Sequence, residues 1–131
     1  MKKTQKKTKG TYADGFVIVI PKNKLNAYRR MAKEGLNMWM KYGALEYREC
    51  FGDDMNVKWG LPFPKMTKAT KNEVVVFSWI VYKSKADRNR INKEVMKGME
   101  DYQKKHPEKK NDMPFDMKKM AYGGFKIVVS E

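Results

Sequence analysis

Hydrophobic residues along the chain follow two patterns, one typical of strands and one typical of helices. Strand patterns are short segments rich in β-branched and aromatic residues, or segments in which apolar and polar residues alternate. Four such segments are present, at 12–20, 44–51, 73–82 and 120–129. In two other segments, at 23–42 and 84–103, apolar residues recur every three or four positions, which predicts helices. The predicted order of elements is therefore βαββαβ.

Residues at the helix ends support these bounds. Asn23 suits the N-cap of the first helix, and Gly43 suits the left-handed position just past its end. Ser84, with Asp87 three residues later, resembles a capping box for the second helix. Both helices are thus predicted to begin at a residue with the chemistry of a cap, and the first is also predicted to end at one.

The order βαββαβ is that of the ferredoxin-like α+β fold, whose four-stranded antiparallel sheet carries two helices on one face. The strand patterns at 12–20, 73–82 and 120–129 are apolar on both faces. One helix layer covers only one face, and the other would expose a larger apolar patch than soluble monomers tolerate. We therefore expect a homodimer that packs sheet to sheet. The alternative is that the long segments 53–72 and 104–119 fold over the free face.

The length of 131 residues fits one domain, which we assign to residues 11–131. Residues 1–10 are lysine-rich without apolar periodicity and are predicted to form a flexible basic tail. No apolar h-region follows them, so they do not resemble a secretory signal, and no apolar run reaches membrane-spanning length. Cys50 is the single cysteine, so no internal disulfide can form and we expect a reducing, cytoplasmic location.

The formal net charge of +14 raises the hypothesis of nucleic-acid binding. Only five of the 29 basic residues are arginine, however, and arginine is the usual side chain for bidentate recognition of phosphates and guanines. The lysine-rich composition favours a solvated surface over sequence-specific recognition. Nonspecific contact with nucleic acids or other polyanions is expected at low salt.

Several sequence segments together resemble the YbaA-like family of bacterial proteins, a family of unknown function. The most specific of them are 76–82 (Phe-Ser-Trp-Ile-Val-Tyr after Val76) and 113–116 (Met-Pro-Phe-Asp), and others are 14–16, 21–25, 28–32, 43–47, 49–50, 52–54, 92, 95–96 and 122–125. The resemblance covers about residues 12–129. It implies the dimeric α+β barrel fold shared with antibiotic-biosynthesis monooxygenases, and it implies no activity or cofactor. Asn89 and Lys119 depart from the aspartate and arginine usual in the family.

No recognised catalytic or metal motif is present, and neither a metal nor a cofactor is predicted. Asp14 and Ser78 lie within apolar strand patterns, so each needs a hydrogen-bond partner if buried. In a dry cavity Asp14 would be suited to act as a general base; the alternative is a carboxylate capped by backbone amides at the strand end.

Three further polar residues, Glu46, Arg48 and Cys50, share one face of the strand at 44–51. Glu46 and Arg48 would orient a polar ligand in the barrel, or form an ion pair on a wet edge. Arg48 would also activate the Cys50 thiol if the two were close, whereas the alternative is a small strand residue without reactivity.

Large aromatic residues occur in the predicted loops, namely Trp59, Phe63 and Phe115. They are candidates for a lid over a ligand pocket, or for plugs that fill the seam of the sheet or the dimer.

Three hypotheses follow for the function. The first is a small-molecule-binding homodimer that acts either as a binding protein or as a cofactor-independent enzyme. The second is a binder of nucleic acids or polyanions through the lysine-rich surface, and the third is a structural or interaction protein with a filled barrel. An enclosed polar pocket favours the first, clustered lysines favour the second, and a filled core favours the third.

Overall fold

The computed structural model describes residues 9–109 and 113–131, so residues 1–8 of the predicted tail lie outside the described residues. The strands are β1 (Tyr12–Pro21), β2 (Glu46–Phe51), β3 (Glu73–Tyr82) and β4 (Met120–Lys126). The helices are α1 (Leu25–Lys41), a short α2 (Phe63–Thr67) and α3 (Lys85–Lys105), with 3-10 turns η1 (Lys22–Lys24) and η2 (Met117–Lys119). The long elements follow the predicted order βαββαβ, and α2 is an addition between β2 and β3.

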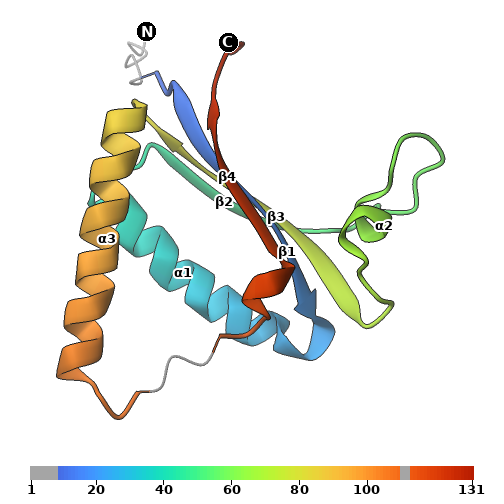
Figure 1. Ribbon diagram of the computed structural model, residues 1–131, viewed down its shortest axis with the longest axis horizontal. Coiled ribbons are helices and arrows are strands. Elements are labelled where there is room, and N and C mark those ends of the chain that lie inside the picture. The colour runs from blue at the N-terminus through green and yellow to red at the C-terminus, as the bar shows by residue number, and fades with distance from the viewer. Residues whose placement is uncertain (1–8, 110–112) are drawn as a thin grey trace, which may run out of the picture.

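The four strands form one antiparallel sheet in the order β2-β3-β1-β4. Both long helices lie on one side of this sheet, and α2 lies on the other side (Figure 1). The α+β fold with a four-stranded antiparallel sheet is thereby confirmed, and the strand order agrees with the ferredoxin-like plan.

The face of the sheet that carries α1 and α3, called here the inner face, holds the hydrophobic core. Even-numbered residues of β1 and β3 point to it, because side chains alternate along a strand. Two clusters of buried side chains fill the space between sheet and helices: Ile18, Ile20, Tyr28, Ala32, Val76 and Phe115 in one, and Ala44, Ile80, Tyr82, Ile91 and Val95 in the other. Phe16 packs against both clusters and joins them.

The opposite face, called here the outer face, is apolar along its centre. Val17 pairs with Phe77 across β1 and β3, and Phe77 contacts the ring of Trp79 at 5.5 Å between centroids. Phe77 is 45% exposed and Phe125 of β4 is 61% exposed. The sequence prediction of two apolar faces is confirmed for β1 and β3, and no long helix covers the second face (Figure 1).

The caps agree with the predictions at two of three positions. The Ser84 hydroxyl accepts a hydrogen bond from the Asp87 amide at 3.1 Å, and Gly43 has a positive φ of 116°. The N-cap predicted at Asn23 is wrong. Asn23 lies in the η1 turn after Pro21, and Lys24 takes the cap position without a side-chain hydrogen bond.

The structure differs from the prediction at two further places, the loop predicted at 53–72 and the end of the last strand. The segment 53–72 contains α2, which has Pro62 at its N-cap and ends at Lys68 in the left-handed conformation. A proline before the first turn suits a helix start because its φ is already fixed. β4 ends at Lys126, three residues earlier than predicted, since its pairing with β1 stops opposite Tyr12. Among the described residues, no helix is long and apolar enough to cross a membrane.

We predict opposite effects for alanine at the two helical glycines, Gly35 of α1 and Gly98 of α3. A Cβ at Gly35 would lie 2.6 Å from the Tyr47 hydroxyl, whereas the nearest atom at Gly98 is a flexible Met38 methyl at 3.4 Å. Gly35→Ala should lower the free energy of unfolding by about 1–3 kcal/mol through overpacking. Gly98→Ala should raise it by up to about 1 kcal/mol through helix propensity. Urea unfolding measures both, and equal effects of the two variants would contradict the packing at Gly35.

Candidate functional site

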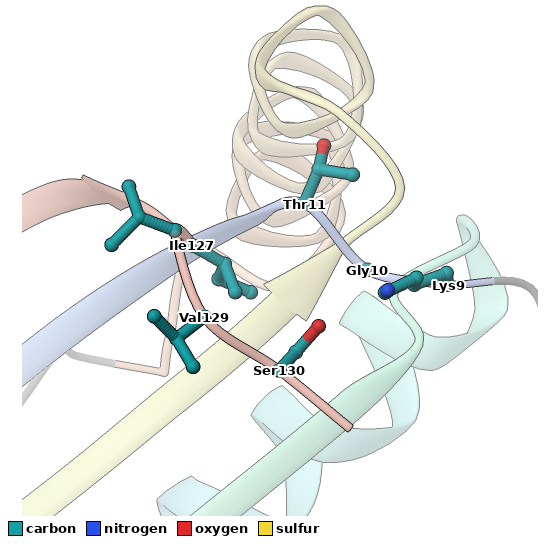
Figure 2. Close-up of a pocket in the computed structure, with 7 residues that line it drawn as sticks. Lys9, Gly10, Thr11, Ile127, Val129 and Ser130 are labelled. Carbon is teal, nitrogen blue, oxygen red and sulfur yellow. The ribbon is translucent and has the colours of Figure 1, made fainter.

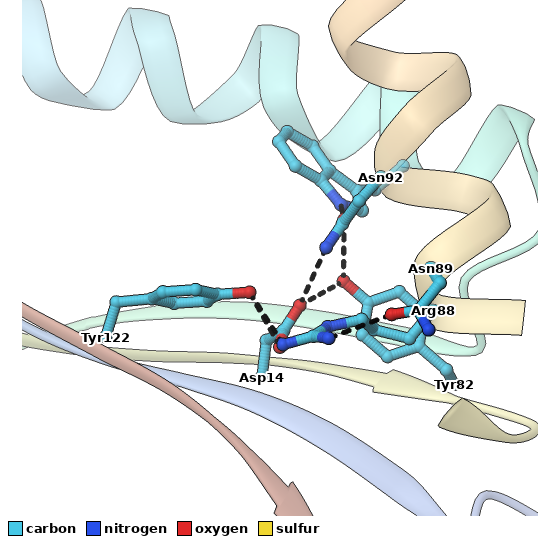
Figure 3. Close-up of polar contacts among 7 residues, drawn as sticks. Asp14, Tyr82, Arg88, Asn89, Asn92 and Tyr122 are labelled. Atoms are coloured by element: carbon cyan, nitrogen blue, oxygen red, sulfur yellow. Dashed lines mark hydrogen bonds and ion pairs between the residues drawn. The ribbon is translucent and has the colours of Figure 1, made fainter. Parts of the chain in front are cut away.

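A buried carboxylate, Asp14 of β1, is the centre of the largest side-chain hydrogen-bond network on the inner face. Its exposed fraction is 1%. Arg88 of α3 donates from Nε to Oδ1 at 2.9 Å, and the hydroxyl of Tyr122 on β4 donates to the same oxygen at 3.1 Å. Tyr82 of β3 donates to Oδ2 at 2.8 Å, and Asn92 of α3 donates to it at 3.3 Å. Figure 3 shows these four donors converging on Asp14 from three elements.

The indole of Trp39 on α1 extends the network to the other long helix. Its Nε1 donates to Oδ1 of Asn92 at 2.9 Å. This bond occupies the carbonyl end of the Asn92 amide, so the NH₂ end is directed at Asp14. The network therefore connects β1, β3, β4 and both long helices.

Arg88 lies at the rim of the network, with 17% of its side chain exposed. Besides Asp14, it donates from Nη2 to the Tyr122 hydroxyl at 3.0 Å and from Nη1 to Oδ1 of Asn89 at 2.9 Å. The guanidinium also lies over the ring of Tyr12, 5.4 Å from its centroid. Arginine has five N–H donors, and the side chains named here take three of them.

Gly124 makes room for this guanidinium. A Cβ at this position would lie 2.7 Å from Nη2 of Arg88 and 2.4 Å from the Tyr12 hydroxyl. The missing side chain at Gly124 thus lets these two polar side chains approach the backbone of β4.

Burial and the charge of Asp14 shift the pKa values of its neighbours Tyr82, Tyr122 and Arg88. Burial, followed by the hydrogen bond to Asp14 and its charge, raises the pKa of Tyr82. The pKa of Tyr122 is raised by burial and by Asp14, and Arg88 lowers it only in part. Burial of Arg88 disfavours its charge, but the hydrogen bond and charge of Asp14 outweigh burial and raise its pKa. Both tyrosines are thus held as hydroxyl donors and Arg88 as a cation.

The geometry decides what Asp14 can do chemically. A carboxylate offers about four acceptor sites, and here two donors reach each oxygen. A general base needs an acceptor site within reach of the proton that it removes. Asp14 has all of its sites occupied by protein donors, so the arrangement suits a carboxylate that positions Arg88 and Tyr122.

Ser78, the other buried candidate, lies on the inner face at a distance from this network. It is 4% exposed, and it pairs with Phe16 of β1 and Glu49 of β2. Ser78 lowers the pKa of Tyr28, but burial of Tyr28 and the neighbouring Glu49 outweigh this effect. Asp14 and Ser78 therefore share the inner face, without a hydrogen bond between them.

Glu46, Arg48 and Cys50 lie on the outer face, away from Asp14. Arg48 and Glu46 form an ion pair at 3.3 Å, with side chains 64% and 42% exposed. Glu46 also accepts a hydrogen bond from Trp79 Nε1 at 2.8 Å. Cys50 is exposed and pairs with Phe77 across the sheet. The alternative of an exposed ion pair thus describes Glu46 and Arg48 in this chain.

The three aromatic residues expected in a lid are not brought together. Trp59 is 86% exposed in the segment before α2. Phe63 of α2 packs against Phe77 of the outer face, 6.4 Å between centroids. Phe115 is buried against Tyr28 on the inner face, 5.9 Å between centroids. Because Phe63 and Phe115 pack on opposite faces of the sheet, the three do not cover one pocket within this chain.

Sequence reasoning selected Asp14 but missed its partners Tyr82, Arg88, Asn92 and Tyr122. The sequence contains a pattern that could have identified two of these four partners. Arg88 and Asn92 are four residues apart and therefore share one helix face next to the apolar stripe of α3. A buried aspartate requires donors, and these were the polar side chains of α3 on the face toward the sheet.

Two hollows elsewhere on the surface contain none of the network residues. The larger, of about 520 Å³, lies between the start of β1 and the C-terminal segment, and residues 9–11 and 127–130 line it (Figure 2). The smaller, of about 180 Å³, lies among residues 54–63. The ranges 9–109 and 113–131 contain no group of three or more metal-ligating side chains.

We predict that Asp14→Asn lowers the free energy of unfolding by about 3 kcal/mol or more, because it leaves the Arg88 cation without its buried partner. The matched control is Glu100→Gln, which removes an exposed ion pair with Lys104 and should change stability by less than about 0.5 kcal/mol. Chemical denaturation at neutral pH measures both variants. A loss for Asp14→Asn no larger than the control would contradict the central role of this carboxylate.

Comparison with known proteins identifies relatives over nearly the whole chain. Residues 11–117 match the family model described as "Protein of unknown function (DUF1428)". The "Uncharacterized protein YbaA" of Escherichia coli (strain K12) is 39% identical over 92% of this chain and 98% of its own length. The protein of the same name from Shigella flexneri is similar to the same extent. The predicted resemblance is confirmed: the chain belongs to the DUF1428 family, whose function is unknown.

Proposed function

We propose that this protein is a homodimer that binds a small anionic molecule at Arg88. The observation that carries the proposal is the placement of the Arg88 guanidinium. Buried Asp14 fixes its Nε, Tyr122 fixes its Nη2, and the group still reaches solvent. A carboxylate or phosphate group would accept hydrogen bonds from the N–H groups that these side chains leave free.

The energetic cost of the Asp14–Arg88 pair supports a role in binding. Burying an ion pair costs desolvation of both groups, and well-packed apolar side chains of similar size often stabilise a fold as well or better. Asp14 is almost completely buried in this pair. A pre-positioned guanidinium, on the other hand, loses little side-chain entropy when a ligand binds. The arrangement thus fits recognition better than stability alone.

The net charge of the chain supports an anionic ligand over a cationic one at this rim. A formal charge of +14 on 131 residues attracts anions over distances of about 10 Å at ordinary ionic strength. No reaction step is part of the proposal, because the donors around Asp14 leave no acceptor site for a substrate proton.

The outer face supports the homodimer. The exposed rings of Phe77 and Phe125 and the partly buried ring of Trp79 form the apolar surface at the centre and edge of this face. Sheet-to-sheet packing against a second copy would remove this surface from water, and a two-fold axis needs only one self-complementary patch. The exposed thiol of Cys50 on the same face fits a reducing compartment, and we propose a cytoplasmic location.

The arginines support binding of nucleic acid less than they support binding of a small anion. Arg48, Arg88 and Arg90 each pair with a carboxylate of this chain. Three of the five arginines thus already use part of their guanidinium donors within the protein, which leaves fewer free donors for a run of phosphates than for the single anionic group proposed at Arg88.

We predict that inorganic phosphate and benzoate shift the NMR signal of the Arg88 Nε–H saturably in the wild-type protein. Arg88→Met should weaken binding of the better ligand by about tenfold or more, because a charged hydrogen-bond donor is lost. Arg29→Met removes the same charge from an exposed site on α1 and is the matched control. Equal weakening in both variants would mean that the anion responds only to net charge, and would refute the site.

For the homodimer we predict a mass in solution of about twice 15.4 kDa, measured by light scattering after size exclusion. Phe77→Asp should give the monomer, because it places a charge in the apolar contact. Met96→Asp is the control, since Met96 is 64% exposed on α3 and lies away from the outer face. A wild-type monomer, or a dimer that persists in Phe77→Asp, would refute sheet-to-sheet packing.

A further inference from the structure

A second carboxylate on the inner face, Glu49 of β2, is held by two tyrosine hydroxyls. Tyr28 of α1 donates to Oε1 at 2.6 Å, and Tyr47 of β2 donates to Oε2 at 2.9 Å. Burial, then the hydrogen bond and charge of Glu49, raises the pKa of Tyr28. Burial, then the charge and hydrogen bond of Glu49, raises that of Tyr47. Both tyrosines therefore remain donors, and each oxygen of Glu49 keeps about one acceptor site unfilled.

Glu49 differs from the other carboxylates that are at least partly buried, which are Asp14, Glu46, Glu73, Asp87 and Glu94. Each of those five has an arginine or lysine nitrogen within 4.0 Å. In the part of the chain that the structure describes, Glu49 has none. A partly buried charge without a counter-charge is unfavourable, and this chain carries a large excess of cations.

Two further aromatic rings pack against the tyrosines that hold this carboxylate. Tyr28 contacts Phe51 at 6.3 Å between centroids, and Tyr47 contacts Trp39 at 6.1 Å. Gly35 of α1 leaves room for the Tyr47 hydroxyl, which a Cβ would approach to 2.6 Å. β2 is an edge strand of the sheet, so no further strand closes this side. Aromatic faces beside a carboxylate are the environment in which organic cations bind.

From this geometry we infer that Glu49, Tyr28 and Tyr47 form a binding site for an organic cation with N–H donors, such as a primary ammonium or a guanidinium. The cation donates to the two unfilled acceptor sites of Glu49, and the neighbouring rings provide cation–π contacts. The site supplies the missing counter-charge of Glu49 from outside the chain. It is distinct from the anion site at Arg88. Trp39 packs against Tyr47 and donates to Asn92 of the Asp14 network, but among the described residues no side-chain hydrogen bond joins Glu49 or its tyrosines to that network.

The donor set favours an organic cation over a metal ion. Glu49 supplies a single carboxylate, and protonated tyrosines are poor ligands. The described residues contain no cluster of three acidic, histidine or cysteine side chains that would complete a metal site. An ammonium or guanidinium needs only acceptors in the positions that Glu49 already presents.

The test is NMR titration of the full chain with n-butylammonium and methylguanidinium, observed at the Tyr28 and Tyr47 rings and at the Glu49 amide. Tetramethylammonium, which has no N–H donor, and sodium are the reference cations at equal ionic strength. Glu49→Gln keeps the shape and removes the charge. Glu46→Gln, on the outer face of the same strand, is the matched control.

We expect saturable shifts with n-butylammonium or methylguanidinium at millimolar concentration. Glu49→Gln should weaken binding about tenfold or more, because a hydrogen bond to a charged group is lost, while Glu46→Gln should leave it unchanged. The readout at the Tyr28 and Tyr47 rings and the Glu49 amide separates this site from the proposed anion site, whose readout is the Arg88 Nε–H. Tighter binding of N-acetyl-lysine methylamide than of n-butylammonium would identify a protein lysine as the natural occupant, and the reverse would identify a free amine.

Three results would overturn the inference. One is the absence of saturation with either N–H cation, and another is equal affinity in wild type and Glu49→Gln. The third is an equal response to tetramethylammonium or sodium, which would indicate charge screening in place of a site. Circular dichroism of Glu49→Gln verifies its fold, and if this variant is unfolded, Glu49→Asp replaces it, because the shorter side chain withdraws the carboxylate from the rings and should also weaken binding.

Discussion

The buried carboxylate of Asp14 is the interaction on which the arrangement of the sheet and its helices depends. A carboxylate removed from water must recover its hydrogen bonds from the protein, or the fold loses several kcal/mol. Asp14 recovers four, from β3, β4 and two positions of α3. Any shift of α3 along the sheet would break at least two of them at once. The polar network therefore fixes the position of α3 along the sheet, which apolar packing alone would define less strictly.

The local pattern of apolar and polar residues was sufficient to predict the four strands and the two long helices. β3 has the bounds predicted from its sequence, Glu73–Tyr82, because a continuous β-branched and aromatic run has few other stable conformations. Ser84 was predicted as a cap because its role depends on Asp87, only three residues away. Asn23 was predicted wrongly because Pro21 leads into a 3-10 turn first, so the helix begins two residues later.

The site was predicted less well, since it depends on contacts between distant residues. Asp14 was selected because a charge inside an apolar strand needs an explanation, and that requirement is local. Its partners Arg88 and Tyr122 are 74 and 108 residues away, and they reach Asp14 only through the packing of α3 on the sheet and the pairing of β4 with β1. The packing of Phe63 and Phe115 was likewise not predictable from the local sequence. Both are aromatic residues in predicted loops, and only the fold shows that they pack on opposite faces of the sheet.

The inner face contains two carboxylates under different constraints. Asp14 has an internal cation and a full set of donors, so its charge is neutralised where it lies. Glu49 has two neutral donors, and no lysine or arginine nitrogen of the described residues lies within 4.0 Å of it, although the chain has 29 lysines and arginines. The edge position of β2 explains why the fold tolerates this charge, since one side remains open to water or to a ligand. The positive charge of the surface and the negative charge of this edge are therefore separate features, and the two proposed sites take ligands of opposite sign.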